Sequence, residues 1–287
     1  MCLLCLFVAP FSVPPCLCGK LFKMNITSRD NALLRHARGV RDGKTRESIY
    51  VEGLRLCREA LSSNLNIEAV IYSDEIAKKD RAAELIHELE KVSAKSASVS
   101  EKLLESISYT KTPQGIVVLA ARPEISDSEF KEAQSESPLL VVLHGINNPV
   151  NVGAILRTAE AAGATGVIAT KGTSDPFSPK SLRGAMGSAF RLPIWSDAEL
   201  QNVISWCREQ KIRTVAADAT GSQSYVNLDW RIPTALVMGQ ESAGLSEEEV
   251  AATDESVNIP MQGSTESLNV AVAAAILLYE AHRQRAG

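Results

Sequence analysis

Three polar segments in the C-terminal half of the chain carry residues that could bind an anionic or nucleotide-like ligand. They occupy positions 144–159, 239–246 and 260–270, and each follows a short apolar run that predicts a buried strand. Open α/β sheets bind ligands in loops at the carboxyl ends of their strands. Three glycine-bearing polar loops in one domain are more than a scaffold requires, so we expect them to form a ligand site.

The first segment, His-Gly-Ile-Asn-Asn-Pro-Val-Asn-Val-Gly-Ala-Ile-Leu-Arg-Thr-Ala, leads into a predicted helix. The backbone N–H groups and the dipole at a helix start favour an anion. Arg157 follows Gly153 by four residues, so its guanidinium should project over a patch bare of side chains and could hold a phosphate through two hydrogen bonds. The segment is equally compatible with an Asn151 that only caps the helix and an Arg157 that is a surface residue.

The second segment places an acid in a glycine-bearing turn. Gly239 and Gly244 permit a tight turn around Glu241, next to a buried strand. A lone acid of this kind is more often simply solvated. Ser246 and Glu249 have the spacing of a capping box, which is a structural role.

In the third segment, Asn269 opens an apolar helix after Ile-Pro-Met-Gln-Gly-Ser-Thr-Glu-Ser-Leu, and it could be an N-cap and nothing more. Other known ligand-binding motifs do not match this sequence. Residues 39–45 resemble a phosphate-binding loop but have three residues between the glycines instead of four. We find no His, Cys or acid cluster with metal-ligand spacing and expect no metal.

The elements that would position these segments follow an α/β pattern from residue 138 onward. Near-continuous apolar runs are typical of a parallel sheet covered on both faces. The predicted strands are 139–143, 166–170, 214–218, 234–238 and 257–259. The predicted helices are 152–162, 179–186, 197–210, 246–252 and 268–285.

The rest of the chain divides into three parts. Residues 24–121 predict a small α/β domain, with strands at 49–51, 69–72 and 115–120 and helices at 31–41, 53–62 and 79–91. Residues 122–137 are polar and bounded by prolines, and we interpret them as a linker. Residues 1–23 are apolar with three prolines, too short for a membrane span. A signal peptide stays open, but we favour Met24 as the natural start and place this leader outside the fold.

The composition is that of an ordinary globular protein, with 287 residues, 45% hydrophobic and 22% charged. The net charge of −4 does not favour nucleic acid, but six basic and two acidic residues lie within positions 29–46. We predict that Arg35, Arg38 and Arg41 contact RNA, the alternative being a solvated helix face. Cys57 and Cys207 are isolated in predicted helices and should be buried thiols, which fits a cytoplasmic protein.

The three segments resemble, in order and spacing, the motifs of the SpoU (TrmH-type) branch of the SPOUT RNA methyltransferases. The similarity covers residues 139–280, and Ile-Pro-Met-x-Gly-x-x-x-Ser-Leu-Asn-Val is highly specific. Residues 24–121 are similar to the RNA substrate-binding domain that often precedes this domain, an α/β module related to ribosomal proteins. That weaker likeness rests on Tyr-Val-Glu-Gly-Leu-Arg from position 50 and Thr-Pro-Gln-Gly-Ile from position 112.

The resemblance implies a deep trefoil knot in the C-terminal domain, a rare exception among folds. It also implies a homodimer with the site near its interface, and S-adenosylmethionine held by the knotted loops. The implied cofactor contacts are Gly239, Ile259, Met261, Gly263 and Leu268. The implied reaction-site residues are Asn151, Arg157, Glu241, Ser267 and Asn269.

The implied activity is 2′-O-methylation of a ribose in structured RNA, with ribosomal RNA favoured over transfer RNA. Arginine is the activator proposed for the family, but its pKa above about 12 makes it a poor general base. We therefore expect Arg157 to bind a phosphate and stabilise alkoxide charge, with Asn151 fixing the arginine or the ribose. The alternatives are a transfer-RNA ribose methyltransferase, a base methyltransferase of the same superfamily, and a non-catalytic RNA-binding protein on this fold.

Overall fold

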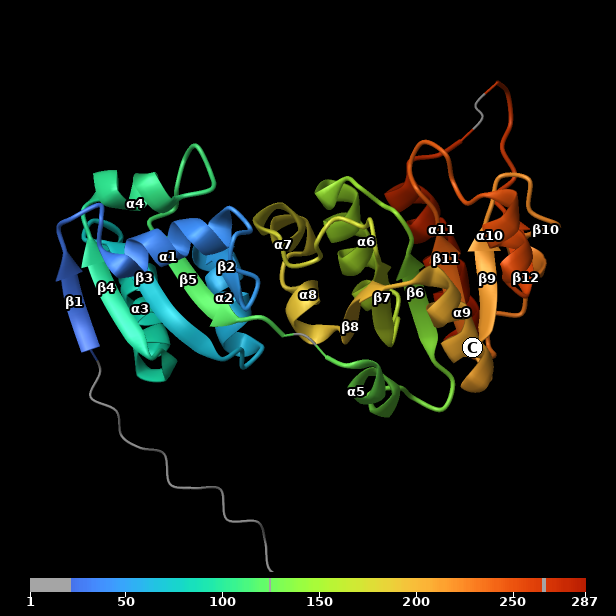
Figure 1. The fold of residues 1–287 in the computed structure, drawn as a ribbon, viewed down its shortest axis with the longest axis horizontal. Helices are drawn as coiled ribbons and strands as arrows, with labels where there is room; N and C mark the ends of the chain where they lie inside the picture. The colour runs from blue at the N-terminus through green and yellow to red at the C-terminus, as the bar shows by residue number, and fades with distance from the viewer. Residues whose placement is uncertain (1–21, 124, 265–266) are drawn as a thin grey trace, which may run out of the picture.

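The computed structural model describes residues 22–123, 125–264 and 267–287, which form two α/β domains (Figure 1). The first domain has a five-stranded sheet in the order β1-β4-β3-β5-β2. Its strands are β1 (Phe22–Ile26), β2 (Ser48–Glu52), β3 (Ile67–Ser73), β4 (Lys95–Val99) and β5 (Ile116–Ala121). One face packs on α2 (Leu54–Ser62) and α3 (Asp80–Val92) and the other on α1 (Ala32–Arg41) and α4 (Glu101–Ile107). The short η1 (Ile76–Lys78) precedes α3.

The predicted α/β character of this domain is confirmed, but its expected start at Met24 is wrong. Phe22 and Lys23 belong to β1 and pair with β4, and Lys23 lies 3.5 Å from the Glu90 carboxylate. The fold therefore includes residues 22 and 23. The rest of the expected leader, residues 1–21, lies outside the described residues.

The second domain has a seven-stranded sheet in the order β10-β12-β9-β11-β6-β7-β8, and every neighbouring pair is parallel, as the apolar runs predicted. Its first strands are β6 (Leu139–Leu143), β7 (Gly166–Thr170), β8 (Ile194–Ala198) and β9 (Arg213–Ala217). The others are β10 (Gln223–Ser224), β11 (Thr234–Met238) and β12 (Glu255–Asn258). The carboxyl ends of all these strands lie at one edge.

Helices cover both faces of this sheet. One face packs against α6 (Pro149–Ala161), α7 (Pro179–Ala185), α8 (Ser188–Arg191) and α11 (Val270–Arg285). The other packs against α5 (Asp127–Glu132) and α9 (Leu200–Glu209). The short α10 (Glu247–Ala252) and η2 (Tyr225–Asn227) complete the domain. In the described part of the chain, no helix is long and apolar enough to cross a membrane.

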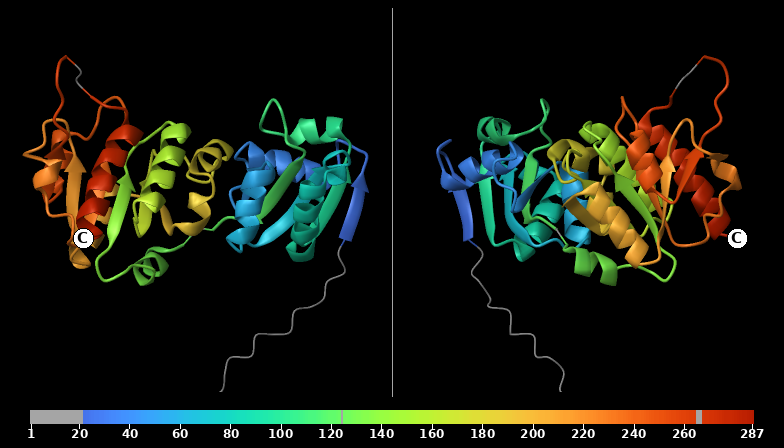
Figure 2. Two further views of the ribbon diagram at one scale, coloured as in Figure 1. Left: turned by 180° about the vertical axis from the view of Figure 1, so that it is seen from behind. Right: turned by 45° about the vertical axis from the view of Figure 1, so that its right-hand side comes forward.

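The path into the last helix determines how the loops meet. β12 lies beyond β9 in the sheet, whereas α11, which follows β12, packs against α6. In both views of Figure 2, α11 (dark red) lies beside α6 (light green). The start of α11 is thereby brought next to the start of α6.

The segment predicted as a linker, residues 122–137, is built into the second domain. It contains α5, with a capping box between Ser126 and Glu129. Phe130 is 0% exposed, and its ring lies 6.1 Å from Trp195 and 5.8 Å from Trp206 between centroids. The interpretation as a free linker is therefore wrong, because this single aromatic anchors the segment beneath the sheet.

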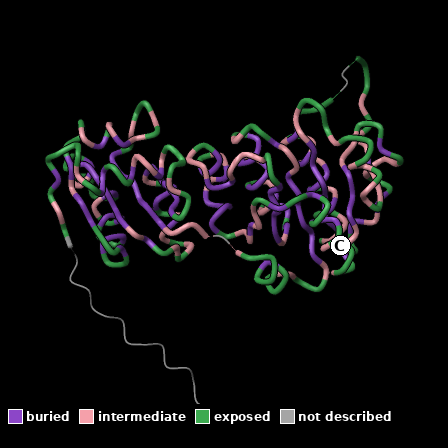
Figure 3. The backbone as a smooth tube through the Cα atoms, in the orientation of Figure 1, coloured by how far each residue is buried: buried purple, intermediate pink, exposed green. Residues whose placement is uncertain are grey.

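The two domains also share an interface. Arg191 of α8 donates to Glu59 of α2 at 2.7 Å and to Glu160 of α6 at 2.9 Å. One cluster of buried apolar residues extends through both domains, and buried chain runs through each of them in Figure 3. The domains are thus joined by apolar packing as well as by the connecting chain.

We expect Phe130→Ala to destabilise the second domain by about 3–5 kcal/mol, because it removes a large buried ring and leaves a cavity. Denaturant unfolding followed by tryptophan fluorescence measures this, since Trp195 and Trp206 contact the ring. Glu132→Ala, an exposed change on the same helix, should alter stability by less than about 0.5 kcal/mol. Equal stability of the two variants would show that the segment is only a linker.

Candidate active site

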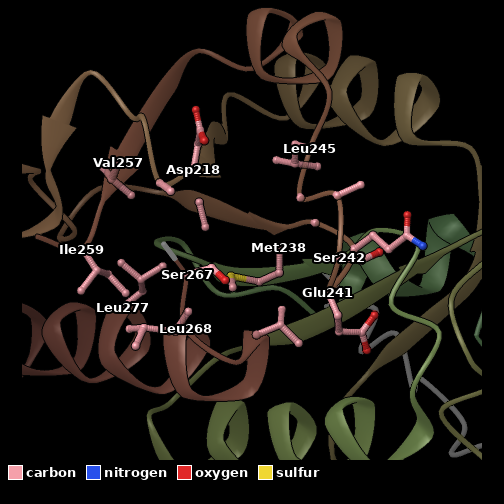
Figure 4. Close-up of a pocket in the computed structure, with 18 of the residues that line it drawn as sticks. Asp218, Met238, Glu241, Ser242, Leu245, Val257, Ile259, Ser267, Leu268 and Leu277 are labelled. Carbon is pink, nitrogen blue, oxygen red and sulfur yellow. The ribbon is translucent and has the colours of Figure 1, made fainter. Parts of the chain in front are cut away.

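A cavity of about 260 Å³ opens at the carboxyl ends of β9, β11 and β12, beside the start of α11. Its walls combine the backbone of residues 239–245 with apolar side chains (Figure 4). The larger of these are Met238, Leu245, Val257, Ile259, Met261, Leu268 and Leu277. Asp218 and Glu241 present carboxylates on different sides of the cavity.

Most of the residues expected to bind a cofactor line this cavity. Gly239, Ile259, Met261 and Leu268 do so, together with the expected reaction-site residues Glu241 and Ser267. Gly263 does not line it: this glycine has φ +79° and no atoms near the position of a Cβ. The expectation that Gly263 contacts the cofactor is therefore not supported by its position.

Sequence reasoning missed Asp218, Met238 and Leu277, which also line the cavity. Asp218 directly follows β9 at the same sheet edge as the three motif loops. The rule that ligands bind at the carboxyl ends of strands could have identified it. Leu277 lies inside the predicted last helix, where nothing in the sequence distinguished it from the other apolar residues.

The three motif segments meet in one hydrogen-bonded chain. Asn151 Nδ2 donates to Glu241 Oε1 at 3.0 Å, and Asn269 Nδ2 donates to Asn151 Oδ1 at 3.3 Å. The Glu241 carboxylate also accepts the backbone N–H groups of Asn147 at 3.2 Å and Asn148 at 3.1 Å. One residue from each motif thus holds the three loops together.

These contacts decide between the alternatives left open by the sequence. Asn148, not Asn151, caps α6, by accepting from the Val150 N–H, and Asn151 is buried. Asn269 does cap α11, so the last helix starts at residue 270 and not at residue 268 as expected, but its amide also reaches Asn151. Glu241 is not a simply solvated loop acid. The capping box of Ser246 and Glu249 is confirmed.

The Glu241 carboxylate is held in its charged form. Partial burial alone would raise its pKa, but hydrogen bonds from the Asn151 amide and from backbone N–H groups, including those of Asn147 and Asn148, outweigh that effect. The pKa of Glu241 therefore lies below its ordinary value. An ionised acceptor with three N–H partners orders the loops and is a poor source of protons at neutral pH.

Close packing explains why two positions in the motifs are occupied by glycine. A Cβ on Gly239 would lie 2.5 Å from the Gly244 carbonyl carbon and 2.7 Å from the Leu245 nitrogen, so the loop can fold back only over a glycine. A Cβ on Gly153 would lie 2.9 Å from Gly184 Cα of α7. The expected bare patch beside Arg157 is therefore covered by α7, which corrects that part of the prediction.

Arg157 is exposed on α6 and has no hydrogen bond or ion pair to any residue that the structure describes. It lies about 9 Å further along the helix axis than Asn151, at 1.5 Å per residue. The chain Glu241–Asn151–Asn269 thus forms without it. Its guanidinium is free to bind an external anion.

The three arginines predicted to contact RNA are in different situations. Arg35 is exposed, and Arg38 donates to the Arg29 carbonyl at 2.9 Å. Arg41 donates to Asp42 at 2.8 Å and to the carbonyls of Ser106 and Ser108 at 3.3 and 3.2 Å. Arg41 thus ties α1 to the end of α4, and its contact with RNA stays a prediction, as do those of Arg35 and Arg38.

Two further predictions concern metals and thiols. Among the residues that the structure describes, no group of three or more His, Cys, Asp or Glu could hold a metal ion. Cys57 and Cys207 are buried free thiols, as predicted. Burial raises the pKa of both, that of Cys207 to about 12, so neither is reactive.

Comparison with known families agrees with both halves of this description. Residues 138–279 match the SpoU rRNA Methylase family, and residues 33–118 match the MRM3-like substrate binding domain. The chain belongs to the SpoU methylase family. The first match contains the cavity and the whole chain of Glu241, Asn151 and Asn269.

Named relatives cover most of the chain. The 23S rRNA (guanosine(2553)-2′-O)-methyltransferase RlmP of Bacillus subtilis is 32% identical over 81% of this chain and 87% of its own length. The 23S rRNA (guanosine-2′-O-)-methyltransferase RlmB of Vibrio parahaemolyticus is 32% identical over 72% of this chain and 85% of its own length.

Solved structures of the family match both domains. The AdoMet-bound rRNA methyltransferase from Sinorhizobium meliloti has a TM-score of 0.80 and 30% identity, covering 91% of this chain and 98% of that one. The SpoU methyltransferase AviRb from Streptomyces viridochromogenes, in complex with AdoMet, has a TM-score of 0.80 and 29% identity, covering 89% and 98%. The family uses S-adenosylmethionine, and the fold of this chain is that of SPOUT enzymes.

Proposed function

We propose that this protein transfers a methyl group from S-adenosylmethionine to a ribose 2′-hydroxyl of ribosomal RNA. The observation that carries the proposal is the convergence of the three motif loops on one cavity through Glu241, Asn151 and Asn269. Relatives named as 23S rRNA 2′-O-methyltransferases support the ribose and the ribosomal substrate.

The cavity fits the cofactor chemically. Its apolar side chains suit an adenine ring, and the Asp218 carboxylate can accept hydrogen bonds from ribose hydroxyls. The backbone of residues 239–245 offers N–H and C=O groups along one wall. When bound, S-adenosylmethionine supplies a methyl group on a positively charged leaving group, so the protein need not provide a metal.

The residues of this chain then position the RNA and stabilise the negative charge that develops on it. Arg157 binds an RNA phosphate and stabilises negative charge on the 2′-oxygen as its proton leaves to that phosphate or to water. Glu241 fixes Asn151 and the loop of residues 147–148, which orients the ribose. Ser267 lines the cavity at the end of the third motif and can donate to the ribose or the cofactor.

Other substrates remain distinguishable by experiment. A transfer-RNA ribose methyltransferase would use the same catalytic groups, but the relatives whose names give one specific substrate are named for 23S ribosomal RNA. A non-catalytic RNA-binding protein would have no use for the intact set of polar motif residues. A ribosomal substrate also agrees with the cytoplasmic location that we expect.

We further infer that the protein is a homodimer through α11 and the start of α6. Val272 and Tyr279 lie two turns apart on one side of α11 and are 49% and 51% exposed. Val150 at the start of the neighbouring α6 is 47% exposed. These apolar side chains lie on two neighbouring helices and form a surface that favours burial against a second copy.

Arg157→Ala should abolish methyl transfer and leave cofactor affinity nearly unchanged, because the cavity is lined by the other two loops. Arg157→Lys keeps the charge but loses the planar pair of donors, so we expect a loss of about 2–4 kcal/mol in transition-state stabilisation. Single-turnover assays on ribosomal RNA at saturating cofactor measure both. Turnover near wild type in Arg157→Ala would refute the assignment.

Tyr279→Asp should convert the dimer to a monomer, because it places a charge in the apolar interface. Light scattering after size-exclusion chromatography measures the mass of each variant. Val92→Asp, which alters another exposed apolar residue on α3, should leave the dimer intact. A wild-type protein that is monomeric at micromolar concentration would contradict the inference.

A further inference from the structure

A second groove, of about 310 Å³, lies between the two domains and outside the cofactor cavity. Arg55 and Leu56 of α2 form one wall, and Arg183 of α7 forms the other. The loop after α4 contributes Thr110 and Gln114. Residues of both the substrate-binding domain and the methylase domain therefore line the groove.

The groove is lined by two arginines and one glutamate, so its charge is positive. Arg55 and Arg183 are exposed, and neither has a hydrogen bond or ion pair to any described residue. Glu52 also lines the groove, but its carboxylate is buried and accepts from the backbone N–H groups of Tyr109 and Thr110 and from the Thr110 hydroxyl. The two guanidinium groups therefore lack an anion.

The walls are held in place by contacts on both sides. Gln114 Oε1 accepts the Leu54 N–H at 3.0 Å, which fixes the loop after α4 to the start of α2. Glu59, one turn after Arg55 on the same helix, binds Arg191 of the second domain at 2.7 Å. The side of α2 that carries Arg55 is thus fixed against α8 of the second domain, so the groove is a defined feature of the fold.

We propose that this groove binds the sugar-phosphate backbone of the RNA substrate, with Arg55 and Arg183 each contacting a phosphate. The proposal rests on the proposed function for the identity of the substrate. Two planar guanidinium groups without acidic partners match phosphate in charge and geometry. In Figure 1 the loop after α4, α7 and the loops around the cavity lie along the same upper edge, so one RNA can contact groove and cavity together.

Such binding sets where the RNA lies relative to the reaction site. Arg55 and Arg183 act as positioning residues, because they lie outside the cavity and hold the RNA through its backbone. Backbone contacts fix register and orientation without reading sequence. Arg55 and Arg183 therefore add two unpaired positive charges beside the methylase domain, whereas Arg41 of the N-terminal basic run is engaged internally.

The test measures binding of a fluorescein-labelled RNA hairpin by fluorescence anisotropy over a range of KCl concentrations. Arg55→Ala and Arg183→Ala should each weaken binding about ten-fold, which corresponds to about 1.4 kcal/mol. Each should also reduce the slope of log affinity against log salt by about one. In methylation assays on large-subunit ribosomal RNA transcribed in vitro, KM for RNA should rise while kcat and cofactor affinity stay unchanged.

Arg58→Ala is the matched control, because Arg58 is an exposed arginine of the same helix that does not line the groove. Its RNA affinity should stay within about two-fold of wild type, the scale of a diffuse surface charge. Equal losses of RNA affinity in Arg58→Ala and Arg55→Ala would contradict RNA binding in the groove, and so would wild-type affinity in the double variant Arg55→Ala/Arg183→Ala. If the wild-type protein methylates no RNA but the groove variants still lose RNA affinity, RNA binding in the groove is supported and the proposed function is refuted.

Discussion

The site depends on one constraint, the hydrogen-bonded chain from Glu241 through Asn151 to Asn269. Its members come from segments about ninety and about thirty residues apart in sequence, so no local propensity brings them together. The ionised Glu241 makes the first bonds charge-assisted, and such bonds are about twice as strong as neutral ones. Removing one partner would leave polar groups without partners beside a partly buried carboxylate, which costs more than the bond itself contributes.

The fold makes this convergence geometrically available. A fully parallel sheet brings the carboxyl ends of β6, β9, β11 and β12 to one edge, where residues of the second and third motifs line the same cavity. Glycines permit the closest backbone contacts. Gly239 lets its own loop fold back onto it, and Gly153 lets α6 pack closely against α7. The Arg191–Glu59 ion pair and the apolar cluster shared by the two domains hold them together, so the groove between them has defined walls.

The sequence predicted the parts of the fold that are governed by local pattern. Apolar runs located β6, β7 and β11 to the residue, because strands buried on both faces have no polar interruption. β4, with the sequence Lys-Ser-Ala-Ser-Val, was missed because its polar residues are tolerated only within the assembled sheet. β8 was also not predicted, and the first two residues of the predicted helix 197–210 belong to this strand, which forms by pairing with β7. The tertiary contacts of Phe130 and Arg41 likewise leave no local pattern in the sequence.

The site residues could be predicted from their residue types and from the family resemblance. Their connection through Asn151, and the capping of α6 by Asn148 and not by Asn151, depend on tertiary contacts that the sequence pattern does not show.

The most direct test of this account is a double-mutant cycle on cofactor affinity with Asn151→Ala, Asn269→Ala and both changes together, measured by calorimetry. Asn151 does not line the cavity, so it can affect the cofactor only by holding the loops that do. The account predicts that Asn151→Ala weakens S-adenosylmethionine binding and that the two changes are coupled by about 1–3 kcal/mol. Unchanged affinity in Asn151→Ala, or losses that simply add in the double variant, would contradict it.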